Sequence, residues 1–159
     1  MTQVGRRSVF VGIPGLVASG LAATVGGADA SSIEKAVLAV SAEMTRAGEA
    51  LDADRLFGYV LDTDRVSVIQ NGVVMATRQE ALEQVRGNLR GLAAVKYDWK
   101  RQYVRVLSPE VAVLAAEGLS TATTAAGQTF TTPFAQTVVF VLRDGAWRAI
   151  HAHQSAPRR

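Results

Sequence analysis

Residues 137–155 read TVVFVLRDGAWRAIHAHQS, and this stretch decides the fold class. Apolar side chains alternate with other residues on both sides of Asp144-Gly145, a dipeptide typical of a tight turn between antiparallel strands. The same alternation runs back to Val95, with further turn signals at Ser108-Pro109-Glu110 and Ala126-Gly127. We therefore predict four long antiparallel strands between residues 95 and 155.

Before these strands the pattern changes to helical spacing. Ser31 and Glu34 have the spacing of a capping box and predict a helix over residues 32–48, and a shorter helix is predicted over residues 52–61. Asn71-Gly72 predicts a hairpin between strands at 65–70 and 73–76. A second capping box begins a third helix at about 78–91. This order indicates an α+β fold, with three N-terminal helices packed on a curved, mainly antiparallel sheet.

The first thirty residues have the three parts of a secretory signal. Arg6-Arg7 end a basic region, an apolar stretch follows, and Ala28-Asp29-Ala30 matches a cleavage site. The arginine pair predicts a twin-arginine signal peptide over 1–30, recognised by the twin-arginine export machinery, and a periplasmic or secreted domain over 31–159. An ordinary secretory signal and a retained membrane anchor are the alternatives.

The composition limits the possible functions. At 159 residues and 48% hydrophobic, the chain can build the core of one domain without cross-links. It contains no cysteine, which excludes disulfides and cysteine-bound zinc. Its 17 basic and 14 acidic residues are interspersed, so no nucleic-acid-binding patch is expected. No nucleotide, flavin or metal motif is present, and we expect no cofactor.

The predicted turns also fix a register between the strands. Two-residue turns place Gln102 opposite Glu117, Glu117 opposite Gln136, and Gln136 opposite His153. These four side chains would form a polar row across one face, beneath the helices and beside an apolar floor. An apolar cavity with a few convergent polar groups is typical of a small-molecule site.

In such a cavity, Glu117 and His153 are the predicted catalytic residues, acting as general acid and base with His153 as the proton shuttle. The alternative is a buried hydrogen-bonded cluster without turnover. The remaining predicted ligand-binding residues are Gln102, Gln136, His151, Trp147, Phe140, Tyr59 and Asp64. Asp64 could instead cap loop N–H groups, and Tyr59 could belong to the core. His151 and His153 share a face, but with no cysteine and only Glu117 and Asp64 as further ligands, no metal site is predicted.

The opposite face of the sheet is predicted to be a partner surface. Tyr97, Trp99, Tyr103 and Arg105 would lie there together, and aromatic residues with arginine are favoured at interfaces. We therefore predict a homodimer through this outer sheet face. The alternative is a bulge within residues 95–107 that turns Trp99 inward to become a wall of the pocket.

Several segments resemble a known superfamily. LDTDRVSVIQNG (61–72), TRQEALEQV (77–85), VRVLSPEVAVLAAEG (104–118) and residues 137–155 are similar to the nuclear transport factor 2-like superfamily, closest to its SnoaL-like and bacterial unknown-function branches. The resemblance covers roughly residues 32–155. It implies a cone-shaped fold with a pocket and dimerisation through the sheet. Known members include ketosteroid isomerases, polyketide cyclases, epoxide hydrolases, dehydratases and non-catalytic binding modules.

The resemblance does not carry over the best-known catalytic residues. The positions of the two aspartates of ketosteroid isomerases fall near Ile69 and Thr137, which are not carboxylates, and the Asp-Arg-Asp arrangement of epoxide hydrolases is not found. We therefore predict an exported pocket protein for a small apolar molecule, with cofactor-free acid–base chemistry of an isomerase, cyclase or hydrolase type. The alternative is a non-catalytic binding or assembly module that works through its sheet-face dimer surface.

Overall fold

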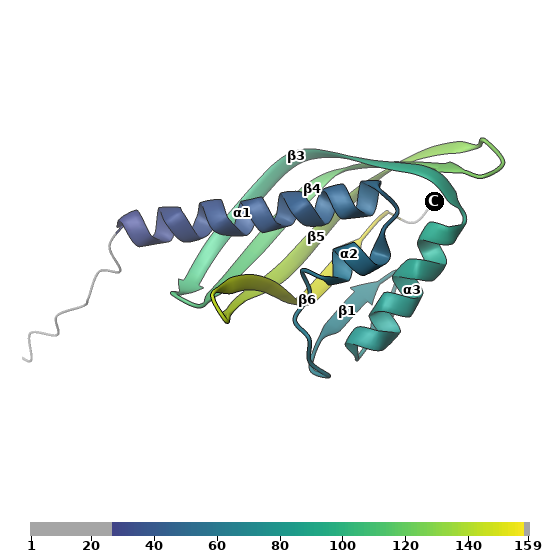
Figure 1. Ribbon diagram of the computed structural model, residues 1–159. Coiled ribbons are helices and arrows are strands. Elements are labelled where there is room, and N and C mark those ends of the chain that lie inside the picture. Colours follow the sequence, from purple (N-terminus) through teal and green to yellow (C-terminus); the bar gives the residue numbers. More distant parts are fainter. Residues whose placement is uncertain (1–26, 158–159) are drawn as a thin grey trace, which may run out of the picture.

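The computed structural model describes residues 27–157, which form three helices and six strands (Figure 1). In chain order these are α1 (Gly27–Glu49), α2 (Ala53–Phe57), β1 (Ser67–Gln70), β2 (Val73–Met75), α3 (Arg78–Arg90), β3 (Leu92–Ser108), β4 (Val111–Thr124), β5 (Thr129–Arg143) and β6 (Ala146–Ser155). The strands form one mixed sheet in the order β2-β1-β6-β5-β4-β3. Only β1 and β6 pair in parallel. The predicted α+β fold and its four long strands are confirmed.

The second helix is shorter than predicted. α2 spans only five residues, whereas α3 follows the β1–β2 hairpin in the predicted order. α2 ends at Phe57 because the chain then pairs with β6: the Leu61 amide donates to the Ala149 carbonyl at 2.9 Å, and the Ala149 amide donates to the Tyr59 carbonyl at 2.9 Å. These backbone hydrogen bonds replace the helical ones that the sequence pattern predicts up to residue 61.

The ends of the helices follow the capping rules in part. Thr77 caps α3 as predicted, with its hydroxyl accepting from the Glu80 amide at 3.2 Å, and Asp52 caps α2 by accepting from the Arg55 amide at 2.9 Å. Ser31 does not begin α1, because that helix already starts at Gly27. The predicted cleavage site thus lies in the first turn of α1, whereas the rest of the predicted signal peptide lies outside the described residues.

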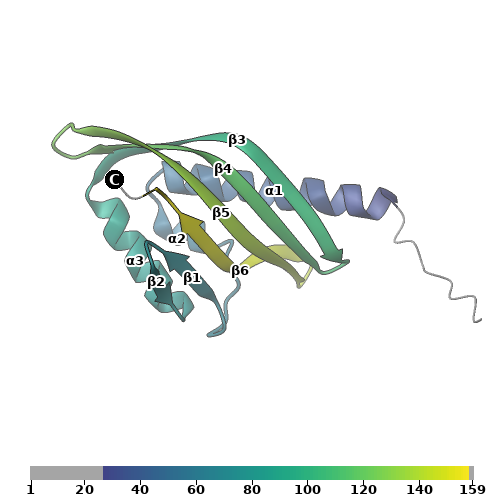
Figure 2. The ribbon, with the colours of Figure 1, turned by 180° about the vertical axis from the view of Figure 1, so that it is seen from behind.

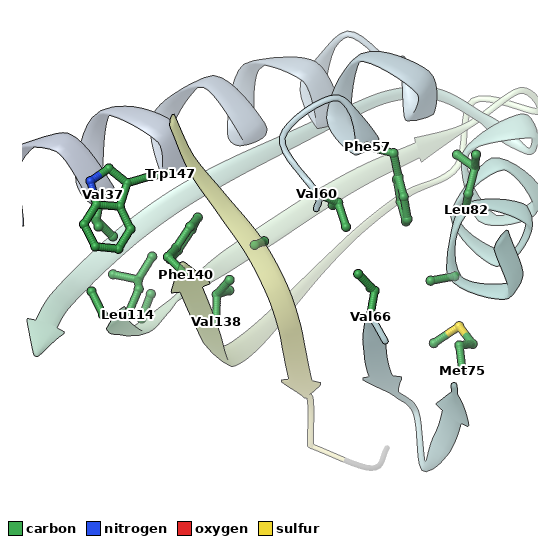
Figure 3. Close-up of a cluster of buried hydrophobic side chains, with 14 of the residues drawn as sticks. Val37, Phe57, Val60, Val66, Met75, Leu82, Leu114, Val138, Phe140 and Trp147 are labelled. Atoms are coloured by element: carbon green, nitrogen blue, oxygen red, sulfur yellow. The ribbon is translucent and has the colours of Figure 1, made fainter. Parts of the chain in front are cut away.

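The helices cover one face of the sheet and leave the other open. α1 lies across the long strands in Figure 1, and the opposite view in Figure 2 shows these strands with no helix in front of them. Between the layers is an apolar cluster, in which Val37, Leu114 and Phe140 are completely buried (Figure 3). We call the two sides of the sheet the covered face and the outer face.

The strand register differs from the predicted one at the β4–β5 turn. The turn contains three residues, 125–127, instead of two, so Thr123 pairs with Thr129 and Glu117 pairs with Ala135. Gly127 has a φ of +82°, the left-handed conformation that closes a three-residue hairpin loop. The extra residue shifts the register by one position, and a one-residue shift transfers side chains to the opposite face.

A bulge in β6 produces a second shift. Phe140 pairs with Ala149 as predicted, but beyond Ile150 the next partners are Val139 and His151. Gln136 consequently pairs with Gln154, and His153 pairs with Thr137. A further bulge in β3 gives Arg101, instead of Gln102, as the partner of Glu117. The predicted polar row is therefore divided between the two faces.

Candidate functional site

A cavity of about 140 Å³ lies between α1, α2, α3 and the covered face. Most of the side chains that line it are apolar, and Phe140 lies at its base beside Val138. The other lining residues are Ser41, Met44, Thr45, Gly48, Leu56, Phe57, Val60, Val66, Ser67, Val68, Gln70, Val85, Tyr97, Trp99, Gln136, Ala149, Ile150, His151, Ala152 and Gln154. None of them is an aspartate, glutamate, lysine or arginine. The cavity therefore offers neutral polar groups and no fixed charge.

Three glutamines from adjacent strands form the polar side of the cavity. Gln70 of β1, Gln154 of β6 and Gln136 of β5 are successive partners in the register. The Gln70 amide donates to Gln154 Oε1 at 2.8 Å, and the Gln154 amide donates to Gln136 Oε1 at 3.0 Å. Because each buried amide has a partner, the row is tolerated within an otherwise apolar site.

Two more hydrogen bonds connect polar residues of the lining. Ser67 Oγ lies 2.8 Å from His151 Nδ1. On the opposite wall, Trp99 Nε1 donates to Thr45 Oγ1 at 3.2 Å, and that hydroxyl donates to the Ser41 carbonyl at 3.0 Å. In the strand register, Ser67 and His151 are partners on the same face as Ile69 and His153, so the imidazole of His151 lies on the outer side of the sheet, opposite to Ala152 and Gln154.

An aromatic cluster closes the cavity next to Thr45. Tyr97 stacks on Trp99 with ring centroids 6.1 Å apart, and Phe134 meets Trp99 edge-on at 5.1 Å. Burial raises the pKa of the Tyr97 hydroxyl above its usual value, and the nearby carboxylate of Glu49 adds to this shift. The Tyr97 hydroxyl is therefore neutral at physiological pH.

Only part of the predicted site is present in this cavity. Gln136, His151 and Phe140 line it. Their ligand-binding roles remain predictions. Four other predicted ligand-binding residues are absent from the lining, namely Gln102, Trp147, Tyr59 and Asp64. Gln102 and Asp64 are exposed, whereas Trp147 is packed in the apolar cluster and Tyr59 is half-buried.

The predicted placement of Glu117 and His153 within the cavity is wrong. The two register shifts put both residues on the outer face, where they lie with Tyr103 along a shallow hollow of about 260 Å³. Glu117 is paired there with Arg101, at 2.6 Å, and both side chains are about half exposed. The exposed ion pair does not need a catalytic role to be stable.

The predicted partner surface is also divided. Tyr97 and Trp99 line the cavity, because another bulge in β3 falls between Trp99 and Arg101, separate from the one between Val106 and Ser108. The alternative prediction of an inward-turned Trp99 is thus confirmed. Tyr103 and Arg105 are exposed, with 51% of Tyr103 accessible.

The sequence interpretation missed several lining residues, including Gln70, Gln154, Ser67 and Thr45. Gln70 could have been found, because it directly precedes the Asn71-Gly72 turn and the parallel pairing of β1 then places it beside Gln154. Thr45 has no comparable signal, since its position depends on how α1 lies on the sheet.

Within residues 27–157, no group of three or more histidine, cysteine, aspartate or glutamate side chains is arranged to hold a metal ion. None of the helices described is long and apolar enough to cross a membrane.

Comparisons with known proteins agree with this architecture. The structure resembles a nuclear transport factor 2-like superfamily protein from Salmonella enterica (TM-score 0.75, 16% identity, 81% of this chain and 94% of the other). It also resembles a protein of the same family from Streptomyces avermitilis, provisionally named a dehydratase (TM-score 0.73, 17% identity, 81% and 99%). A third similar structure is a hexachlorocyclohexane dehydrochlorinase (TM-score 0.70, 13% identity, 82% and 89%).

At these identities the solved structures show a shared fold. The search of curated proteins gave no match. The model of the SnoaL-like domain matches residues 37–159, which include nearly all of the region described here. The chain belongs to the SnoaL-like domain family.

Proposed function

We propose that this protein binds a small, uncharged, largely apolar molecule in the cavity between the helices and the covered face. The observation that carries the proposal is a cavity of about 140 Å³ whose lining has neutral polar groups on one side and no charged side chain. A cavity of roughly this size accepts a single ring, such as benzene, when its walls are apolar. A charged ligand would lose its hydration without gaining a partner.

Binding, without acid–base turnover by Glu117 and His153, is the function that this geometry favours. General acid–base catalysis needs the donor and acceptor within hydrogen-bond reach of the reacting group, and these two side chains lie on the other face of the sheet.

A matched pair of substitutions tests the binding proposal. Val68 lines the cavity, whereas its neighbour Ile69 is equally half-buried and is not part of the lining. We expect Val68→Phe to fill part of the cavity, so that a single-ring probe no longer fits without a steric clash. The affinity for such probes should fall at least about tenfold. Ile69→Phe should leave the affinity unchanged. Titration of cyclic hydrocarbons and ketones, followed by NMR, measures both; equal affinities of the two variants would refute the site.

We also propose that the domain is exported by the twin-arginine route. The support is the sequence of residues 1–30, with Arg6-Arg7 before an apolar stretch. Replacement of both arginines by lysine should retain the protein in the cytoplasm, as measured by fractionation and the mass of the mature chain. Unchanged export would instead indicate an ordinary secretory signal.

We also propose that the protein forms a homodimer through the outer face. The support is the uncovered surface of β3–β5, where Tyr103 is 51% exposed and lies beside Ala115 and Thr137 in the shallow hollow. This surface is also what favours the alternative function, a non-catalytic assembly module. Tyr103→Glu should shift the sedimentation coefficient to that of a monomer. A wild-type monomer at high concentration would exclude the dimer.

A further inference from the structure

The glutamines of the cavity belong to a longer ladder of side-chain amides. Gln84 of α3 donates to Asn88 Oδ1 at 3.2 Å, and Asn88 donates to Gln70 Oε1, also at 3.2 Å. From Gln70 the ladder continues through Gln154 to Gln136, with distances of 2.8 and 3.0 Å. We call these five residues the amide ladder. It leads from the exposed surface of α3 to the cavity.

All four links of the amide ladder point in the same direction. In each link an amide nitrogen donates to an amide oxygen of the next residue, beginning at Gln84 and ending at Gln136. Turning one internal amide alone would place two nitrogens or two oxygens against each other and lose two hydrogen bonds. The orientation of Gln136 is therefore coupled to that of residues on α3.

The ladder ends at Gln136 because the next strand offers no side-chain acceptor. The partner of Gln136 on β4 is Ala116, which has only a methyl group. The Oε1 atom of Gln136 is used by Gln154, and within the described residues its Nε2 amide donates no hydrogen bond. This donor belongs to a side chain that lines the cavity.

We propose that the amide ladder holds Gln136 as a hydrogen-bond donor and that the bound molecule carries a neutral oxygen acceptor, of the carbonyl class, at this end. The inference rests on the proposed function, because it assigns the polar group of the molecule that the cavity binds. The Nε2 amide of Gln136 has no partner in the described part of the chain and keeps some access to solvent, and a carbonyl oxygen of the ligand supplies the acceptor that replaces water when the cavity is filled. A carboxylate is disfavoured, because the lining contains no cation to pair with it.

Asn88 and Gln154 are positioning residues in this arrangement. Asn88 is exposed on α3 and does not line the cavity, while Gln154 connects Gln70 to Gln136. Without Gln154, the Oε1 atom of Gln136 loses its hydrogen-bond donor. The Gln136 amide can then rotate and present either its oxygen or its nitrogen to the ligand. The discrimination between acceptor and non-acceptor ligands should then fall while the cavity itself persists.

A pair of probes of nearly equal shape isolates the hydrogen bond. Cyclohexanone carries a carbonyl oxygen where methylenecyclohexane carries a methylene group. The quantity measured is the ratio of their dissociation constants in wild type and in each variant, so that differences in hydration cancel. One neutral hydrogen bond corresponds to roughly a 2- to 10-fold change in this ratio. We expect that loss of ketone preference in Gln136→Met and Gln154→Met, and no change in the control Gln79→Met, whose side chain bonds Glu83 outside the ladder.

The possible outcomes separate this inference from the proposed function. If both probes bind wild type and the ratio is the same in Gln136→Met, the carbonyl assignment is wrong and the binding function stands. If neither probe binds wild type, both proposals fail. A preference for the hydrocarbon that disappears in Gln136→Met would also overturn the donor role.

A second measurement tests the ladder without any ligand. Asn88→Ala removes an exposed side chain, so folding should be unaffected, yet it should shift the side-chain amide resonances of Gln136 in ¹⁵N-labelled protein. Gln79→Ala, on the same helix, should leave them in place. If neither substitution or both substitutions move these resonances, the coupling between α3 and the cavity is refuted.

Discussion

The two faces of the sheet carry different kinds of polar group. On the covered face, the polar side chains are amides and hydroxyls that pair with one another, as in the row from Gln70 to Gln136. On the outer face they include charged side chains, as in the Arg101–Glu117 ion pair. Burial of a neutral group costs little once it is hydrogen-bonded, whereas burial of a charge costs far more. This contrast is the basis of the proposal that the covered face binds an uncharged molecule.

The largest difference in stability between the two faces is expected when a large side chain is truncated. Phe140 is fully buried on the covered face, and its neighbour Val139 is half-buried. We expect Phe140→Ala to lower the free energy of unfolding by about 3–5 kcal/mol. For Val139→Ala the loss should be roughly 1 kcal/mol. Urea denaturation monitored by tryptophan fluorescence measures both. Similar losses at the two positions would show that the core is not concentrated on the covered face.

The next largest effect is expected where β3 and β4 approach most closely. A Cβ atom added at Gly118 would lie 2.5 Å from the Asp98 carbonyl oxygen, so the strands must move apart. Gly118→Ala should destabilise the protein by about 1–3 kcal/mol, the usual cost of overpacking. The control is Gly87→Ala on α3, where no atom lies within 4 Å and the better helix former should stabilise by up to about 1 kcal/mol. A neutral Gly118→Ala variant in thermal unfolding would contradict the close approach.

Alkaline pH provides a smaller test of the uncharged lining. The pKa of Tyr97 is raised above 10.0, first by burial and then by Glu49, so the unfolded chain releases this proton at lower pH than the folded one. The stabilisation is complete below pH 10 and is lost as the pH rises through the folded-state pKa. Urea midpoints measured above pH 10 should therefore fall less steeply in Tyr97→Phe than in wild type. If Tyr97→Phe and the wild type lose stability equally above pH 10, Tyr97 is not in an environment that disfavours charge.

The smallest effects should come from the outer face. Glu117→Gln and His153→Ala should each change the free energy of unfolding by less than about 1 kcal/mol, because exposed ion pairs and exposed side chains contribute little. Both variants should retain wild-type affinity for the cavity probes. Calorimetric titration tests this, and a loss of affinity in either variant would mean that the outer face takes part in ligand binding.

Much of the fold could be predicted because it depends on local signals. The Thr77 cap and the Asn71-Gly72 turn each act within a few residues, and the structure confirms both. The site depends on register over longer distances. The three-residue loop at 125–127 and the bulge at Ile150 each shift a strand by one position, which was enough to transfer Glu117 and His153 to the outer face. The alternating pattern of these strands does not predict either irregularity.

Gln136 lies in the site as predicted, because neither the loop at 125–127 nor the bulge at Ile150 moves it from the covered face. Its predicted neighbours were replaced by Gln154 and Ala116, so the acid–base pair became a row of amides. Gln136 thus keeps its predicted face although both of its predicted cross-strand partners are different residues.

The most direct test of the account is the register of β5 against β6 in solution. Cross-strand nuclear Overhauser effects in isotopically labelled protein report it without any ligand. We predict backbone contacts that link Gln136 with Gln154 and Val138 with Ala152. Contacts that link Gln136 with His153 and Val138 with His151 would place His153 beside Gln136 on the covered face and contradict the row of amides.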